Sequence, residues 1–158
     1  MERQAKQITK NLFLGSRKDI PKDADLIISC AAEIYDQYQD DPIAEQLNAD
    51  IFKIDNRYFY RWPDYPQDNE IDTNQIKHAL NLIKNNIADK KIYVHCVWGI
   101  NRSASLVFMY LLKTKFILED NFEQAINKYC VIYNNYGPNP GWYNYIKNNF
   151  DSIRANNW

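Results

Sequence analysis

The feature that most constrains this chain is the segment 91–114, in which a strand passes through a short loop into an apolar helix. Lys91–His95 has the composition of a buried strand, and residues 102–114 are strongly apolar with helical spacing. Only residues 96–101 separate the two. A strand that passes so directly into a helix is typical of a sheet covered by helices.

The rest of the chain alternates strands and helices in the same way. Strands are predicted at 7–14 (two strands joined by a turn), 26–30, 49–55 and 91–95, and helices at 71–87, 102–114, 121–133 and 142–153. Residues 56–69, with two prolines among aromatic and polar side chains, are predicted to be a long loop. This order predicts an α/β fold in a single domain, with a central, mostly parallel sheet and helices on both faces.

Composition narrows the class of protein. A chain of 158 residues with 46% hydrophobic side chains can fold without disulfide bonds. Its net charge of −1 argues against a surface built to coat nucleic acid. No apolar run reaches the roughly 18–20 residues that span a bilayer, and the first residues lack a signal-peptide core. We therefore expect no membrane contact.

Cysteine and histidine usage indicates the compartment. Cys30, Cys96 and Cys130 are scattered, which is typical of free thiols in a reducing compartment such as the cytoplasm. The two histidines form no zinc-type spacing with them, so no metal is expected. Frequent Asn, Ile, Lys and Tyr, which have AT-rich codons, favour an AT-rich genome such as that of a large DNA virus, a parasite or a protist. A viral protein of this kind would be found in the host cytoplasm or the virion.

The loop from Cys96 to Arg102 has the chemistry of an anion-binding site. Backbone N–H groups that open a helix can surround a tetrahedral anion, and the Arg102 fork can bind two phosphate oxygens. The same field stabilises a thiolate at Cys96, while Ser103 can donate a hydrogen bond to its sulfur. We therefore expect Cys96 to be a nucleophile beneath a phosphate that is held by Val97, Trp98, Gly99, Ile100, Asn101 and Arg102.

His95-Cys96, five intervening residues and Arg102-Ser103 resemble the signature loop of the cysteine-dependent protein tyrosine phosphatase superfamily. Further segments are similar to its dual-specificity branch: Leu12–Ser16, Arg102–Ser105 and Pro138–Trp142. The resemblance covers most of the chain. It implies one dual-specificity phosphatase-like catalytic domain over residues 1–158, with the fold of that superfamily. Trp98 departs from the family pattern, which usually has a small residue there.

The resemblance also implies a general acid, and Asp64 is the candidate. It lies in Trp62-Pro63-Asp64, which is similar to the acid loop of the tyrosine-specific branch. Asp55 and Asp68 are rivals for this role. In the implied mechanism, Cys96 attacks phosphorus to form a phosphocysteine, and Asp64 protonates the leaving oxygen and then activates water. No cofactor is required.

Three further residues receive supporting roles. His95 is expected to hydrogen-bond behind the loop, and Asn139 to tether the loop as the matching family position does, unless it is simply a turn residue. Cys30-Ala31-Ala32-Glu33 resembles a segment of lipid- and protein-phosphatase relatives whose second cysteine forms a bridge. Cys30 is therefore either a redox partner of Cys96 or a small buried side chain.

Three functions remain open at this point. The first is a phosphatase acting on phosphotyrosine, and on phosphoserine or phosphothreonine, in protein partners. The second is an RNA 5′-triphosphatase of the same superfamily, since Asn101 precedes Arg102 and residues 56–62 mix arginines with aromatics. The third is a non-catalytic phosphate-binding module. The oligomeric state is left open.

Overall fold

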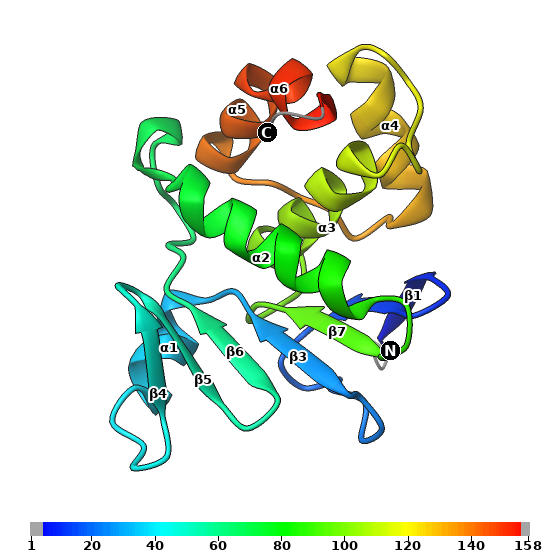
Figure 1. The fold of residues 1–158 in the computed structure, drawn as a ribbon. Helices are drawn as coiled ribbons and strands as arrows, with labels where there is room; N and C mark the ends of the chain where they lie inside the picture. The colour runs from blue at the N-terminus through cyan, green and yellow to red at the C-terminus, as the bar shows by residue number, and fades with distance from the viewer. Residues whose placement is uncertain (1–4, 156–158) are drawn as a thin grey trace.

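A computed structural model describes residues 5–155 of the chain. They form one mixed sheet with helices on both faces (Figure 1), which confirms the predicted α/β class. The strands are β1 (Lys6–Thr9), β2 (Leu12–Gly15), β3 (Leu26–Ser29), β4 (Glu45–Asn48), β5 (Ile51–Ile54), β6 (Arg57–Tyr60) and β7 (Ile92–His95). The helices are α1 (Ala32–Tyr38), the short 3-10 turn η1 (Asp68–Glu70), α2 (Thr73–Asn86), α3 (Arg102–Lys113), α4 (Phe122–Ile132), α5 (Pro140–Asn148) and α6 (Phe150–Arg154).

The sheet has the strand order β1-β2-β7-β3-β6-β5-β4. The four central strands β2, β7, β3 and β6 are parallel, whereas β1, β5 and β4 pair antiparallel at the two edges. The parallel part is therefore the centre of the sheet. Because its strands point the same way, the loops after β3, β6 and β7 all leave from one edge.

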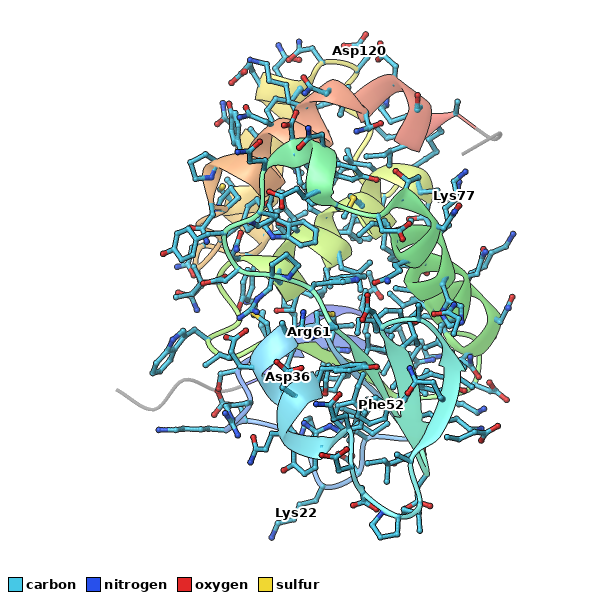
Figure 2. All side chains as sticks on the ribbon, turned by 90° about the vertical axis from the view of Figure 1, so that its left-hand side faces the viewer. Lys22, Asp36, Phe52, Arg61, Lys77 and Asp120 are labelled. Atoms are coloured by element: carbon cyan, nitrogen blue, oxygen red, sulfur yellow. The ribbon has the colours of Figure 1, made fainter. Side chains whose placement is uncertain are left out.

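The two faces of the sheet bury different cores. Leu26, Ile28, Ile92 and Val94 face α2–α6, where they join the large apolar core. On the other face, Phe52 and Phe59 pack against Ile34 and Tyr35 of α1, which lies across the sheet in Figure 2. The alternation along each strand follows from the period of two in extended chains.

The prediction of a loop over residues 56–69 is wrong for its first part. Asp55 adopts a left-handed backbone conformation (φ 52°), which allows a tight turn between β5 and β6. Residues 57–60 then pair with β5 on one side and with β3 on the other. The stretch from Arg61 to Gln67 that remains outside regular structure carries the Trp-Pro-Asp segment.

Three other elements differ from the prediction. No helix was predicted where α1 lies, because its seven residues are too few to show a helical apolar period. β4 was not predicted, because all of its residues are exposed and give no apolar alternation. The last predicted helix, 142–153, begins earlier at Pro140 and is interrupted at Asn149, so that it forms α5 and α6. The other predicted strands and helices are confirmed, and Asn121 caps α4 by accepting a hydrogen bond from the Gln124 N–H. No helix between residues 5 and 155 is long and apolar enough to cross a membrane.

Candidate active site

The loop between β7 and α3 lies at the edge where the central parallel strands end. Gly99 has φ 73°, and a Cβ there would come within 2.6 Å of the Gly15 carbonyl carbon. Only glycine fits this position without strain. The Gly99 carbonyl accepts a hydrogen bond from Tyr133 Oη at 2.7 Å. The loop therefore packs closely against the end of β2 on one side and is hydrogen-bonded to the residue after α4 on the other.

Cys96 opens this loop with its thiol only 3% exposed. Burial raises the pKa of the thiol, but hydrogen bonds from the Ser103 hydroxyl, the backbone at Ser103 and Gly99, and the Arg102 charge lower it by more. The resulting pKa is below the ordinary value. Ser103 Oγ donates to the sulfur at 3.2 Å, the contact expected from the sequence. Cys96 is thus suited to exist as a thiolate.

Arg102 lies beneath the pocket, 2% exposed, and is fixed by a partner that the sequence analysis did not identify. Its two terminal nitrogens donate to the two carboxylate oxygens of Glu33 at 2.6 and 2.9 Å. Burial lowers the pKa of the guanidinium, but the hydrogen bond with Glu33 and neighbouring negative charges raise it above its usual value. The hydrogen bond from Arg102 in turn lowers the pKa of Glu33. This bidentate pair fixes the orientation of the guanidinium.

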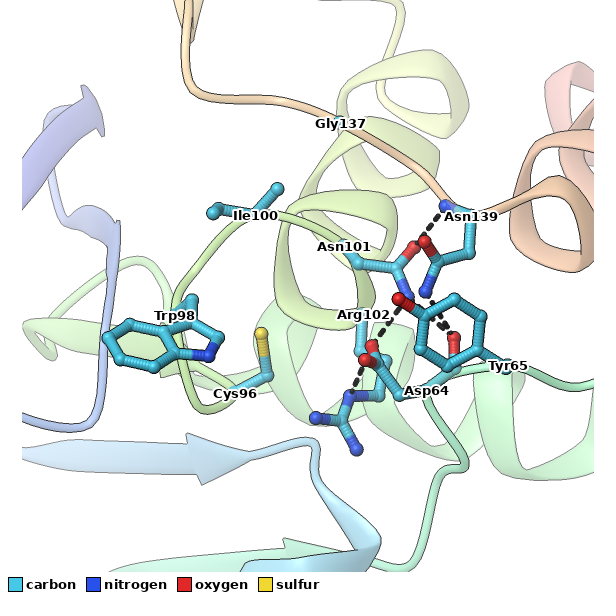
Figure 3. Close-up of a pocket in the computed structure, with 9 residues that line it drawn as sticks. All are labelled: Asp64, Tyr65, Cys96, Trp98, Ile100, Asn101, Arg102, Gly137 and Asn139. Atoms are coloured by element: carbon cyan, nitrogen blue, oxygen red, sulfur yellow. Dashed lines mark hydrogen bonds and ion pairs between the residues drawn. The ribbon is translucent and has the colours of Figure 1, made fainter.

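Asp64 lies across the pocket from Cys96, as Figure 3 shows. Its Oδ1 accepts a hydrogen bond from Asn101 Nδ2 at 2.8 Å and lies 3.4 Å from Arg102 Nε. The rival carboxylates are elsewhere. Asp55 is in the turn before β6, at the opposite end of that strand, and Asp68 accepts from Asn148 on α5. Of the three, Asp64 alone lines the pocket.

The pocket itself is a small cavity of about 160 Å³, below the roughly 300–1,000 Å³ of sites for drug-sized ligands. Two exposed rings border it: Trp98, 60% exposed, and Tyr65, 78% exposed. Figure 3 places them on opposite sides of Cys96. Ile100, Asn101, Gly137 and Asn139 complete the wall. The side chain of Val97 lies instead against the α1 core.

The predicted supporting residues lie around the loop. His95 is fully buried between the Ser29 hydroxyl (2.7 Å) and the Cys96 carbonyl (2.9 Å). The Asn139 N–H donates to Asn101 Oδ1 at 2.9 Å, and its amide donates to the Asp64 carbonyl. Asn139 therefore bridges the Cys96–Arg102 loop (the phosphate loop of the prediction) and the Asp64 segment. Cys30 follows β3 directly beside the loop, with its thiol buried and free.

The aromatic stretch 56–62 does not form an exposed stacking surface. Phe59, Tyr60 and Trp62 are buried in the cores. Arg57 stacks on the Phe59 ring, and Arg61 pairs with Asp36 of α1 at 2.9 Å. Figure 2 labels Arg61 and Asp36. This removes the support that these residues gave to RNA binding.

The site thus combines a cysteine whose pKa is lowered, an arginine fixed by Glu33, a loop of backbone N–H groups and a facing carboxylate. A family model for the catalytic domain of dual specificity phosphatases matches residues 12–129, a range that includes these groups. A search of curated protein sequences gives no match.

Solved phosphatase structures share the fold. DUSP15 superposes with a TM-score of 0.63 at 16% identity, over 96% of this chain and 92% of that one. Human DUSP28 has a TM-score of 0.63 at 13% identity, over 98% of both chains. OH1 from the Orf virus, a tyrosine phosphatase with triple substrate specificity, has a TM-score of 0.56 at 18% identity, over 92% of this chain and 86% of that one.

The family model spans well over half of the sequence, and the structure has the fold of these phosphatases. The chain therefore belongs to the dual specificity phosphatase family and carries its catalytic domain.

Proposed function

We propose that this protein hydrolyses phosphotyrosine, and phosphoserine or phosphothreonine, in protein substrates through a phosphocysteine intermediate. The observation that carries this proposal is the facing arrangement of Cys96 and Asp64 across one small pocket, above the buried guanidinium of Arg102. These are the nucleophile, acid and anion-binding groups that a two-step phosphoryl transfer needs. A non-catalytic module would not need all three.

In the first step, the Cys96 thiolate attacks phosphorus and forms the S–P bond while the bond to the leaving oxygen breaks. Asp64 gives its proton to that oxygen, so that a neutral alcohol or phenol departs. In the second step, water attacks phosphorus, Asp64 takes a proton from it, and the S–P bond breaks to restore the thiolate and release inorganic phosphate. Arg102 and the loop N–H groups hold the equatorial oxygens in both steps.

The primary test compares turnover of phosphotyrosine peptide, phosphothreonine peptide and triphosphate-ended RNA by one preparation of the protein. Release of phosphate from the peptides, but not from RNA, supports the proposal. Release from RNA alone would favour the triphosphatase alternative. Retained phosphopeptide binding without turnover of any substrate would favour a phosphate-binding module.

Variants then assign the roles. Cys96→Ser abolishes turnover but keeps phosphate binding, because a hydroxyl is far less ionised than a thiol. Cys130→Ser, at an exposed cysteine on α4, is the matched control and retains activity. Arg102→Lys is nearly as harmful as Cys96→Ser, since an ammonium cannot reproduce the two-pronged contact. Steady turnover by pure Cys96→Ser protein would contradict the proposal.

A further inference from the structure

We infer that Asn101 is a positioning residue for Asp64: its amide holds Oδ1 of the acid, so that Oδ2 carries the proton exchanged with the substrate. This inference rests on the proposed function. It gives Asn101 a role distinct from that of the loop backbone, which was expected to contact phosphate.

Asn101 occupies the N-cap position of α3, where an asparagine side chain normally accepts a hydrogen bond from the first turn of the helix. Here the side chain makes no such capping bond. Although the residue is only 6% exposed, its amide turns away from the helix and toward the Asp64 segment (Figure 3). Helix capping therefore does not account for this asparagine.

The orientation of the amide is fixed by two backbone groups. Asn101 Oδ1 accepts from the Asn139 N–H at 2.9 Å, which can only donate. Asn101 Nδ2 donates to the Asp64 carbonyl at 2.9 Å, which can only accept. The second hydrogen on Nδ2 is then left for the Asp64 carboxylate, which it meets at Oδ1 at 2.8 Å. Together, these three hydrogen bonds allow only one orientation of the Asn101 amide.

The two oxygens of the Asp64 carboxylate are consequently unequal. Oδ1 receives the Asn101 amide and faces the positively charged Arg102 Nε at 3.4 Å. Within residues 5–155, no hydrogen bond to Oδ2 is formed, and the Asp64 side chain is 39% exposed at the pocket. An acid proton on Oδ1 would oppose both donors. The proton therefore belongs on Oδ2, which is free to meet the leaving oxygen and later the water.

The test measures kcat and KM of Asn101→Ala with two aryl phosphates. Phenyl phosphate has a poor leaving group and needs the acid, whereas 2,4-dinitrophenyl phosphate has a good one and does not. We expect the loss in kcat/KM for phenyl phosphate to exceed the loss for 2,4-dinitrophenyl phosphate by about 10–100-fold. This ratio reports the first step, whereas kcat also contains the second step, which both substrates share. In an Asp64→Ala background, Asn101→Ala should remove no further leaving-group dependence.

Asn101→Asp is the second variant, in case the alanine variant does not fold. It has the same shape and keeps an acceptor for the Asn139 N–H, but it removes the donor to Asp64, so the same difference between substrates is expected. Asn85→Ala, at an exposed asparagine on α2, is the matched control. Equal losses on both substrates, or no loss, would overturn the positioning role while leaving the proposed function in place. Absence of turnover by the unaltered protein would instead overturn the proposed function, and this inference with it.

Discussion

At the scale of single residues, the sulfur of Cys96 depends on a donor from the following helix. Ser103 Oγ donates to it at 3.2 Å and is the first of the contacts that lower its pKa against the effect of burial. In the proposed reaction, the thiolate is the nucleophile of the first step and the leaving group of the second. One hydroxyl therefore serves both steps of the proposed reaction.

Replacing Ser103 by Ala should change the pH profile and the slow step together. Loss of the donor raises the pKa of Cys96, so the acidic limb of kcat/KM moves to higher pH. A hydrogen bond to a charged group contributes about 1.5–3 kcal/mol, so hydrolysis of the phosphocysteine should slow by about 10–100-fold. Rapid-mixing kinetics should then show a burst of released phenol. An unchanged acidic limb and no burst would remove Ser103 from this role.

Trp98 and Tyr65 are the exposed rings at the pocket rim, and Trp98 is the departure from the family pattern. A flat phenolic substrate between them gains about 0.5–1.5 kcal/mol from ring contacts. Trp98→Ala should therefore lower kcat/KM for phosphotyrosine peptide about 2–10-fold, with little change for phosphothreonine peptide. Phe116→Ala, at an exposed ring remote from the pocket, is the control. Unchanged selectivity in Trp98→Ala would limit that ring to packing.

At the scale of elements, the pairing of β3 with β7 brings two cysteines to neighbouring strand ends. Ser29 lies opposite His95 in register, and the Cys30 N–H donates to the His95 carbonyl at 2.8 Å. Cys30 and Cys96 are the next residues after these two strand ends, so they lie side by side. Neighbouring strands are about 4.8 Å apart, a Cα separation that a disulfide tolerates. Burial and the nearby Cys96 raise the pKa of Cys30 well above its usual value, so Cys96 is the thiol that reacts with an oxidant first.

Brief treatment with hydrogen peroxide should convert the Cys96 thiolate to sulfenic acid with release of hydroxide. The Cys30 thiol then attacks that sulfur, forming the disulfide and releasing water. Mass mapping should find a Cys30–Cys96 bridge, and a thiol reductant should restore activity. Cys30→Ser should lose this recovery through over-oxidation, whereas Cys130→Ser should keep it. Equal recovery in Cys30→Ser, with no bridge in the unaltered protein, would leave Cys30 as a buried side chain only.

The same elements show what the sequence could predict. Cys96, Arg102 and Ser103 share one loop and helix start, so their local spacing is enough to predict their chemistry. Glu33 reaches Arg102 across 69 positions of the chain, because α1 begins beside the phosphate loop, and no local pattern reports such a contact. β6 was not predicted for a similar reason, since residues 57–60 form a strand only by pairing with β3 and β5.

At the scale of the whole molecule, the parallel centre of the sheet brings the site together. β3, β6 and β7 run the same way, so α1 with Glu33, the Asp64 segment and the phosphate loop all follow from one edge. His95 lies beneath this edge, fully buried, with its ring between the Ser29 hydroxyl and the Cys96 carbonyl. Because Cys96 O can only accept, Nδ1 carries a proton, and because Arg57 Nη2 can only donate, Nε2 accepts and the ring is neutral.

Burial, reinforced by the charge of Arg57, lowers the pKa of His95 to about 3. An unfolded chain has an ordinary histidine pKa near 6.5, so between these values it binds a proton that the folded protein does not. The stability that the folded protein gains by keeping His95 neutral is complete above about pH 7 and is lost as pH falls. At pH 5 the loss should be on the order of 2 kcal/mol in the free energy of unfolding. Urea titrations at pH 7.5 and pH 5 measure it.

His95→Asn keeps a donor near the Cys96 carbonyl but cannot be protonated, so its unfolding free energy should fall less between the two pH values. The chain has only one other histidine, His78, whose pKa is also lowered by burial. His78→Asn therefore separates the two histidine contributions. If His95→Asn and the unaltered protein lose the same free energy, the acid sensitivity arises elsewhere. If the loss is smaller in His95→Asn, the residue that supports the phosphate loop also couples the stability of the whole fold to pH.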